Sequence, residues 1–372
     1  MTVAADRSAS QRASAQHVLE SLGGSDTFAL AVFAGSAAVG LGHAQSDVDV
    51  HVVLQPGARI ERTTIDDDGY RVQLQVLDPD LVVRLVTLAE KYVVTRNDRS
   101  QSELTDYELW NFIRLVTGEV LSASDSFRQL LDRASFDVAR QVVAANCAHH
   151  AARASQAASG MLGRGQAAAA CHTAALAMAA ACEVVLAATG DLYAVDRFLV
   201  ARLERSPVLN RVFPELWELL YRFPPLDEEP AALAAAARAR VFAASGLVAH
   251  SLLYGWDGTL GDVPALTAAD AGGPVRSPQF GLLRFADTFG LAGRARSLRV
   301  GEAVAAVWAA ADGSPVEEIA RRVQSRGHEA TLDTVTAALD ALARADAVTY
   351  DGRSADEARE EVTHGPSVGD RG

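Results

Sequence analysis

The stretch Gly35-Ser36-Ala37-Ala38-Val39-Gly40-Leu41-Gly42-His43-Ala44-Gln45-Ser46-Asp47-Val48-Asp49-Val50 decides the fold of the first third of this chain. The apolar run over residues 28–33 precedes it and predicts a buried strand. A glycine and a serine then indicate a tight turn into a short glycine-containing helix, and the alternation over residues 47–54 predicts a second strand. The segment therefore predicts strand, turn, short helix and strand in close succession.

The chemistry of this stretch lies in two pairs of residues. Side chains alternate along a strand, so Asp47 and Asp49 are expected on one face, where their charges repel each other. A divalent cation relieves that repulsion, and hard carboxylate oxygens suit Mg²⁺. The turn at Gly35 and Ser36 lets backbone N–H groups and a hydroxyl approach phosphate oxygens. Together these residues predict a nucleotide–metal site for in-line attack on phosphorus.

Length and composition bound the protein class. The chain has 372 residues and a formal net charge of −13, with 49% hydrophobic and 22% charged residues. This length predicts two or three domains, each large enough for its own core. The composition excludes a mainly disordered, collagenous or coiled-coil chain. The acidic balance argues against a protein that coats nucleic acid or an anionic membrane.

The remaining global signals favour a cytoplasmic protein. The three widely spaced cysteines (Cys147, Cys171 and Cys182) do not form a disulfide framework and are expected to be reduced thiols. Residues 1–12 lack a basic start followed by an apolar run, so no signal peptide is expected. The alanine-rich stretch over residues 167–188 predicts a buried helix rather than a membrane span.

The first third of the chain predicts an α/β domain. Asp68-Gly69 is a strong hairpin signal, because a two-residue turn needs residues that tolerate positive φ. The spacing of apolar residues predicts helices over 10–22, 80–95 and 106–116, and strands over 28–33, 47–54, 59–65 and 70–77.

The rest of the chain changes character at residue 136. Alanine, leucine and arginine dominate up to residue 254, which predicts an all-helical bundle punctuated by prolines. Order returns near residue 298 with helices ending at 311 and spanning 316–325 and 332–344, then a strand over 348–350, an order that predicts a small winged helix. The expected domains are 1–134 (α/β), 135–255 (helical, on the acceptor side of the site), 256–290 (linker), 291–352 (winged helix) and 353–372 (disordered tail).

The Gly-Ser turn, the spacer and Ser-Asp-x-Asp between strands resemble the DNA polymerase β-type nucleotidyltransferase superfamily, over about residues 8–134. The segment 114–121 is similar to the one that closes this domain in small antibiotic-modifying members, and 190–193 is more loosely similar to their substrate-side domain. The resemblance implies an α+β domain with a small mixed sheet. It also implies that Gly35, Ser36 and Ser46 bind the triphosphate and that Asp47 and Asp49 hold two Mg²⁺ ions.

The implied reaction is Mg²⁺-dependent transfer of a nucleoside monophosphate, AMP from ATP, to a hydroxyl of a small molecule or a peptide. This chain departs from the superfamily pattern at the third carboxylate, because the neighbouring strand offers only the amides Gln73 and Gln75. A glutamate from elsewhere could complete the site, with Glu183 as the tentative base among Glu103, Glu108, Glu119 and Glu183. The alternative is a catalytically degenerate domain that binds nucleotide for regulation.

The C-terminal module resembles PqqD-like winged helices, which bind leader peptides in the maturation of ribosomally made peptides. The segments that carry the resemblance are 299–303, the Trp308 helix, 312–320 and 335–348. No leading hairpin is evident over residues 280–298. Peptide binding, DNA binding, and packing or homodimerisation stay open as roles, with DNA the weaker because the module is only mildly basic.

Overall fold

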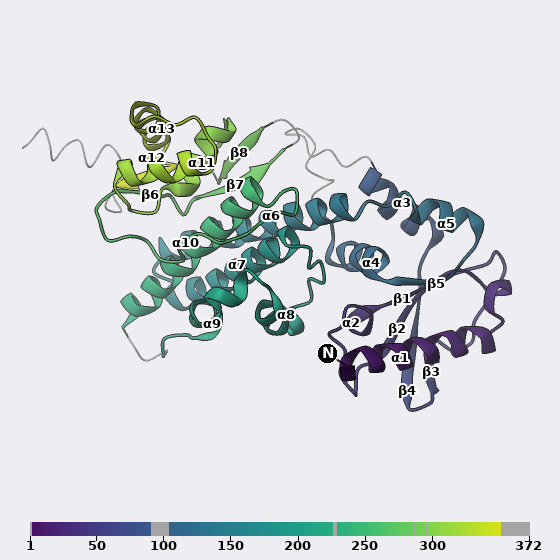
Figure 1. The fold of residues 1–372 in the computed structure, drawn as a ribbon. Coiled ribbons are helices and arrows are strands. Elements are labelled where there is room, and N and C mark those ends of the chain that lie inside the picture. The colour runs from purple at the N-terminus through teal and green to yellow at the C-terminus, as the bar shows by residue number, and fades with distance from the viewer. Residues whose placement is uncertain (1, 91–103, 226–228, 286–287, 295, 351–372) are drawn as a thin grey trace, which may run out of the picture. The chain divides into compact units, whose positions relative to one another are not determined.

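The computed structural model describes residues 2–90, 104–225, 229–285, 288–294 and 296–350 (Figure 1). Its described residues form two compact units. The first comprises residues 2–90, 104–143 and 190–202, and the second comprises residues 144–189 and 203–350. The expected tail over 353–372 lies outside the described residues.

The first unit is built on a five-stranded mixed sheet with the strand order β3-β4-β2-β1-β5 (Figure 1). Strands β2 and β4 run parallel, and the other neighbouring strands are antiparallel. The five strands are β1 (Phe28–Ala34), β2 (Val48–Leu54), β3 (Thr64–Asp67), β4 (Tyr70–Val76) and β5 (Glu119–Ala123). A small mixed sheet was expected, and the structure contains one.

The side chains of strand β2 alternate between an apolar face and a polar face of this sheet. Val48, Val50 and Val52 are fully buried in a core cluster that includes residues of helix α1 (Thr2–Ser21). Because side chains alternate along a strand, Asp49 and His51 lie on the opposite face. The hydrophobic burial of the valines therefore determines which face carries the charged residues.

The other helices of the first unit were predicted in part: those expected from residues 80 and 106 are present, whereas the one over 125–131 was not expected. They are the one-turn α2 (Gly35–Ala38), α3 (Pro79–Glu90), α4 (Asp106–Thr117) and α5 (Asp125–Leu131), with 3-10 turns η1 (Gly24–Asp26) and η3 (Asp196–Phe198). A capping box at Thr105 and Glu108 begins α4. Between β3 and β4, Asp68 and Gly69 have φ values of 45° and 80°, so the predicted hairpin turn is confirmed.

One strand prediction was wrong in this unit, and one strand was not predicted. The strand expected over residues 59–65 begins only at Thr64, because pairing with β4 starts there. Strand β5 was not expected at all, since its sequence Glu-Val-Leu-Ser-Ala carries no clear alternation. Pairing with β1 makes it a strand, and tertiary pairing of this kind overrides weak local preference.

The second unit is dominated by long helices that pack through small residues. Buried alanines and Cys171 of α7 form a core cluster with Leu233, Ala237 and Val241 of α10. Small side chains let two helix axes approach closely over several turns. The helices that lie in this unit or extend into it are α6 (Phe136–Leu162), α7 (Ala167–Ala188), α8 (Leu199–Arg205), α9 (Phe213–Tyr221) and α10 (Pro230–Tyr254), with the 3-10 turn η4 (Leu209–Val212).

Two of these helices are long and apolar enough to cross a membrane by length and composition alone. They are α7, with a mean hydropathy of 1.7 over its most apolar window, and α10, with 1.4. The windows are 61% and 56% buried inside the protein. Core helices of proteins without membrane spans meet the same two criteria. The cytoplasmic location expected from the sequence therefore stays a prediction.

The last third of the second unit contains two small sheets and three helices. Strands β7 (Phe280–Arg284), β8 (Phe289–Gly293) and β9 (Ser297–Val300) form an antiparallel meander, and β10 (Val348–Tyr350) pairs with β6 (Pro274–Arg276). The three helices are α11 (Glu302–Ala310), α12 (Val316–Ser325) and α13 (Leu332–Arg344).

These strands correct two expectations. Residues 274–290, expected to belong to a linker, contain β6, β7 and the start of β8. The hairpin that was not evident over residues 280–298 is present as β7 and β8. The sequence pattern did not predict this hairpin, because Gly281, Gly290 and Gly293 break the alternation that is typical of a strand. The winged-helix assignment itself stays a prediction.

A partly buried ion pair joins helix α12 to the loop that precedes it. Arg322 of α12 donates hydrogen bonds from Nη1 and Nη2 to both carboxylate oxygens of Asp312, at 2.6 and 2.8 Å. Burial opposes ionisation of Asp312, but the hydrogen bonds from Arg322 and Ser314 outweigh it and lower the pKa of this carboxyl to about 2. The bidentate geometry also orients the loop between α11 and α12.

We expect Asp312→Asn to destabilise the protein by about 1–3 kcal/mol at neutral pH, because Arg322 loses an ionised, bidentate acceptor. The folded-state pKa of about 2 lies below the ordinary value of 3.8. Asp312 therefore contributes stability above about pH 4 that is lost as the pH falls toward 2. Urea unfolding of both proteins from pH 7 to pH 2 measures the difference, which should shrink over that window. A difference that stays constant across the window would contradict this assignment.

Candidate functional site

Strand register brings the Gly-Ser turn and the acid pair together. Asp49 lies between Ala34 of β1 and Gln73 of β4, its partners on either side in the sheet. Directly opposed residues share one face, so these side chains belong to the same polar face. Gly35 follows Ala34 at the end of β1, and the turn therefore begins beside Asp49.

Gly35 makes the closest approach in the site. Its φ is +76°, a left-handed conformation that glycine adopts without strain. A Cβ at this position would overlap the Oδ2 atom of Asp49, so only glycine lets the backbone reach the carboxylate. Ser36 is buried at the start of the α2 turn, and Ala34 as N-cap supplies no side-chain hydrogen bond to the first N–H groups.

The position of the absent third acid is occupied by an amide that bonds to the pair. Gln73 Nε2 donates a hydrogen bond of 3.0 Å to Oδ2 of Asp47. An amide N–H can satisfy an ionised carboxylate but adds no negative charge. Gln75 lies two residues further along β4, opposite His51.

A buried cation lies against the second acid. The guanidinium of Arg114 on α4 lies 3.5 Å from Asp49, between Nη2 and Oδ2, and 3.4 Å from Nε2 of His51. Its Cζ atom is 3.3 Å from the centroid of the Trp110 ring, one turn earlier on the same helix. This stacking and the burial of Arg114, which is 3% exposed, hold the cation in one orientation.

The electrostatics of the face show an incompletely compensated negative charge. Burial raises the pKa of Asp49, Asp47 raises it further, and Arg114 and Arg197 lower it, with a net rise. Burial and the neighbouring Arg114 lower the pKa of His51 to about 3, so this imidazole is neutral at pH 7. A further cation near Asp47 and Asp49 would therefore be favoured.

Ser46 lies at the approach to the pair. Its Oγ accepts a hydrogen bond of 2.9 Å from the backbone N–H of His43, which closes the exposed turn before β2. The hydroxyl therefore has a local structural partner in addition to the phosphate role expected of it.

The glutamates considered for the third carboxylate of the site have different surroundings. Glu108 belongs to the capping box of α4 and pairs with Arg84. Glu119 pairs with Arg12 at 2.6 Å. Glu183 is buried on α7 in the second unit, so its role as base stays a prediction. Glu103 lies outside the described residues.

Sequence reasoning missed His51 and Arg114 as site residues. Alternation could have found His51, because it follows Asp47 and Asp49 at the same spacing of two. Arg114 interrupts the apolar run Phe-Ile-Arg-Leu-Val of an amphipathic helix, where a charge needs a buried partner. Only the packing of α4 on the polar face identifies that partner.

A pocket of about 430 Å³ adjoins the Arg114–Trp110 pair within the first unit. Trp110 and Tyr107 of α4 form one side of it, and residues 194–196 form another. Aromatic side chains offer flat surfaces on which a planar group can stack. The pocket is large enough for a small organic group.

The donor set fits one Mg²⁺ ion. Mg²⁺ in phosphoryl-transfer sites is held by one or two carboxylates together with water and substrate phosphates, and Asp47 and Asp49 supply two carboxylates. Burial and the charge of Asp47 raise the pKa of Asp49 despite Arg114 and Arg197, so a bound cation would favour the ionised form of this carboxylate. Among the described residues, no group of three His, Cys, Asp or Glu side chains forms a metal cluster.

Comparisons with known proteins find distant likeness among solved structures. No protein-family model matches the chain, and no curated protein matches it. A crystal structure of a nucleotidyltransferase-like protein from Exiguobacterium sibiricum 255-15 aligns over 65% of this chain and 76% of its own length, with 13% identity and a TM-score of 0.34. This score carries no inference about residues or activity. The PqqD-like resemblance of the C-terminal module finds no support among these matches.

We expect Gly35→Ala to displace the Asp49 carboxylate and to destabilise the protein more than Gly40→Ala does. Gly40 is the matched control, because its φ of 72° carries the same backbone strain but a Cβ there meets no atom within 4 Å. Gly40→Ala should lower the free energy of unfolding by about 1–2 kcal/mol, because of backbone strain alone. Chemical denaturation of both variants measures the difference, and equal losses of stability would contradict the close approach.

Proposed function

We propose that this protein is a nucleotidyltransferase that moves a nucleoside monophosphate, AMP from ATP, onto a hydroxyl of a small molecule or peptide. The observation that carries the proposal is the juxtaposition of Asp49 with the Gly35-Ser36 turn, created by the β1–β2 register. An acid pair beside a glycine turn with uncapped N–H groups can hold both a metal and a triphosphate.

In the proposed reaction, the site residues of the first unit have separate tasks. Asp47 and Asp49 would hold Mg²⁺, which when bound neutralises charge on the phosphoryl oxygens and the leaving pyrophosphate. The N–H groups at Gly35 and Ser36 would orient the terminal phosphates. Arg114 also restrains Asp49, since its Nη2 lies 3.5 Å from Oδ2 and its guanidinium is itself stacked on Trp110. The second metal of the expected two-metal arrangement stays a prediction.

The acceptor and its activation belong to the proposal as well. The pocket beside Trp110 and Tyr107 is a candidate site for a planar part of the nucleotide or the acceptor. We keep Glu183 as the tentative base that takes the proton of the acceptor hydroxyl. A peptide partner at the C-terminal module and a second copy of the chain are proposed partners, in a cytoplasmic protein that modifies a natural product.

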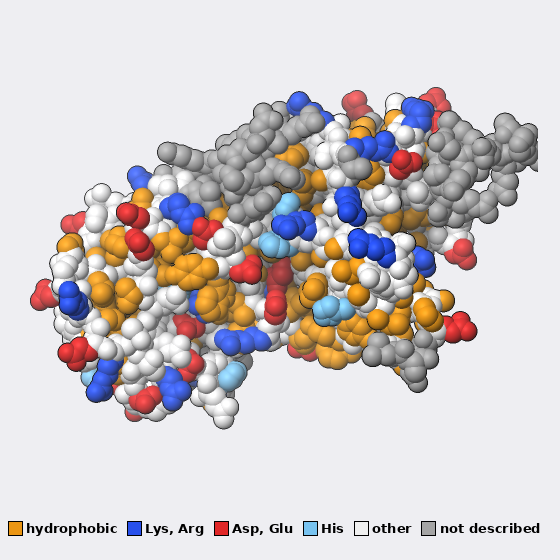
Figure 2. All heavy atoms as spheres, turned by 180° about the vertical axis from the view of Figure 1, so that it is seen from behind, with side chains coloured by type: hydrophobic (Ala, Val, Ile, Leu, Met, Phe, Trp, Pro, Cys, Tyr) orange, Lys and Arg blue, Asp and Glu red, His pale blue; other side chains and the backbone are white. Residues whose placement is uncertain are grey.

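Nucleic acid and membranes are not proposed as partners. Acidic and basic side chains are interspersed over the face drawn in Figure 2, whereas nucleic-acid binding needs a continuous basic surface. The net charge of −13 has the wrong sign for either polyanion.

A second function is favoured by one specific contact. Gln73 binds Asp47 through an N–H where the resemblance implies a third carboxylate. A site that has exchanged an acid for a hydrogen-bond donor could bind a nucleotide without transferring it and serve regulation. Nucleotide binding without pyrophosphate release would distinguish this function from transfer.

We expect Asp47→Asn and Asp49→Asn each to reduce pyrophosphate release from ATP by at least about a hundredfold, because a neutral amide cannot replace a charged metal ligand. The control is Asp66→Asn, at an exposed position on β3 where the carboxylate pairs only with Arg71. Release should be unchanged in the control. Full release by the double variant would exclude the proposed site.

We expect Gln73→Glu to raise the affinity for Mg²⁺ about tenfold, since it adds a charge beside Asp47 and Asp49. Gln75→Glu is the matched control, on the same strand and face but opposite His51. Titration calorimetry with MgCl₂ measures both. Equal affinities in the two variants would show that Gln73 does not adjoin a metal site.

A further inference from the structure

The two oxygens of each site carboxylate have different surroundings. Oδ2 of Asp47 accepts the 3.0 Å hydrogen bond from Nε2 of Gln73. Oδ2 of Asp49 lies 3.5 Å from Nη2 of Arg114, and the backbone of Gly35 approaches it so closely that a Cβ there would come within 2.1 Å. Within the described part of the chain, the Oδ1 atoms of both acids make no hydrogen bond or ion pair. Each acid therefore keeps one oxygen for an ion.

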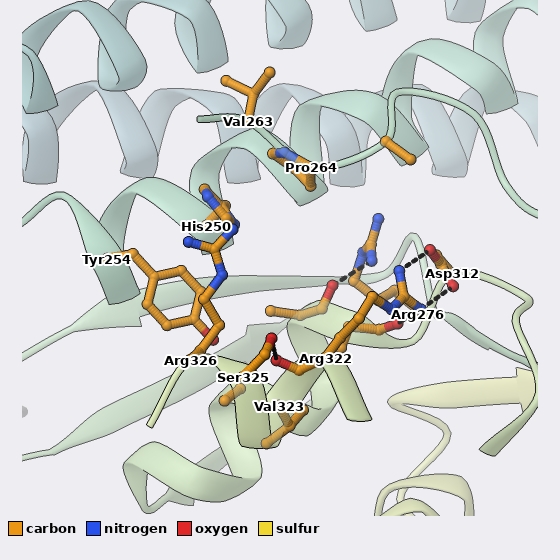
Figure 3. Close-up of a pocket in the computed structure, with 14 residues that line it drawn as sticks. His250, Tyr254, Val263, Pro264, Arg276, Asp312, Arg322, Val323, Ser325 and Arg326 are labelled. Atoms are coloured by element: carbon orange, nitrogen blue, oxygen red, sulfur yellow. Dashed lines mark hydrogen bonds and ion pairs between the residues drawn. The ribbon is translucent and has the colours of Figure 1, made fainter. Parts of the chain in front are cut away.

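An arginine–carboxylate pair that occupies both oxygens has a different geometry. In the second unit, Arg322 donates to both carboxylate oxygens of Asp312, at 2.6 and 2.8 Å (Figure 3). Arg114 instead approaches a single oxygen of Asp49 at 3.5 Å, which is an ion pair without a short hydrogen bond. The contact therefore neutralises Asp49 in part and leaves its other oxygen accessible to a ligand.

The remaining oxygens suit one Mg²⁺ ion. One or two carboxylates complete such a site together with water and substrate phosphates, and the two Oδ1 atoms meet that need. A second ion would have to share Oδ2 of Asp49 with a buried guanidinium, or Oδ2 of Asp47 with an amide N–H. A guanidinium is always charged, and an N–H group turns its positive end toward its acceptor, so both repel a cation.

The balance of charge leads to the same number of ions. The superfamily pattern implies three carboxylates for two divalent ions, which leaves one positive charge in excess. Here Asp47 and Asp49 carry two negative charges and Arg114 carries one positive charge, so a single divalent ion leaves the same excess. Arg114 is 3% exposed and stacked on Trp110, so its charge stays beside Asp49.

From this arrangement we infer that Asp47 and Asp49 bind one divalent cation, and that Arg114 supplies the second positive charge of the site. Gln73 disfavours a second ion, because it donates an N–H to Asp47 where a third carboxylate would attract the ion. Arg114 is a positioning residue, since it acts through Asp49. The inference rests on the proposed function and replaces the second ion that the resemblance implies.

The test is a count of bound ions. Mn²⁺, which accepts the same oxygen ligands as Mg²⁺, is counted per chain by paramagnetic resonance in the presence of α,β-methylene-ATP. We expect one Mn²⁺ in the unmodified protein and in the control Gln75→Glu, but two in Gln73→Glu, whose new carboxylate adjoins Asp47. Two ions in the unmodified protein, or one in Gln73→Glu, would overturn the inference alone. No bound ion in the unmodified protein would contradict the proposed function as well.

A further variant separates the charge of Arg114 from its support of Asp49. Arg114→Gln removes a repelling charge, so the affinity for Mn²⁺ without nucleotide should rise about tenfold. An unchanged or lower affinity would overturn the assigned role, because mere support of Asp49 predicts a loss. The control is Arg84→Gln, which removes an arginine that pairs with Glu108 and should leave the affinity unchanged. If Arg114→Gln does not fold, the ion count in Gln73→Glu decides.

Discussion

The register between β1 and β2 is the constraint on which the rest of the site depends. Val48, Val50 and Val52 are buried on one face of β2, and a shift of one residue would exchange them for Asp49 and His51. Burying a carboxylate and an imidazole in that apolar core would cost far more than it gained. The hydrophobic effect therefore positions the charged groups.

That register brings three kinds of group to one place. The backbone of Gly35 touches Asp49 on one side, Arg114 approaches it on another, and Gln73 binds the adjacent Asp47. The guanidinium of Arg114 is held in position, because it is buried and stacked on Trp110. The acids are thus partly neutralised by the protein itself, yet burial and mutual repulsion still raise the pKa of Asp49. Both proposed functions, transfer and regulation, would use this residual charge.

The second unit shows the opposite electrostatic situation. Its buried Arg276 donates to carbonyl and hydroxyl groups and also feels the charge of Asp312, which Arg322 binds through both carboxylate oxygens. Charged groups in a low-dielectric interior are stable only when paired, so an unbalanced one marks a place for an external ion. In the first unit, Asp49 is such a group and indicates a place for a cation.

Local patterns in the sequence were sufficient for α4, α12, α13 and the Asp68-Gly69 hairpin, because these depend on spacing along one segment. They failed for β5, which exists through pairing with the distant β1, and for the β7–β8 hairpin, whose glycines break the strand alternation. The close contact of Gly35 with Asp49, the role of Gln73 and the ion pair with Arg114 also required tertiary structure. Each joins residues from different elements, and the free energy of such contacts depends on packing that no single segment encodes.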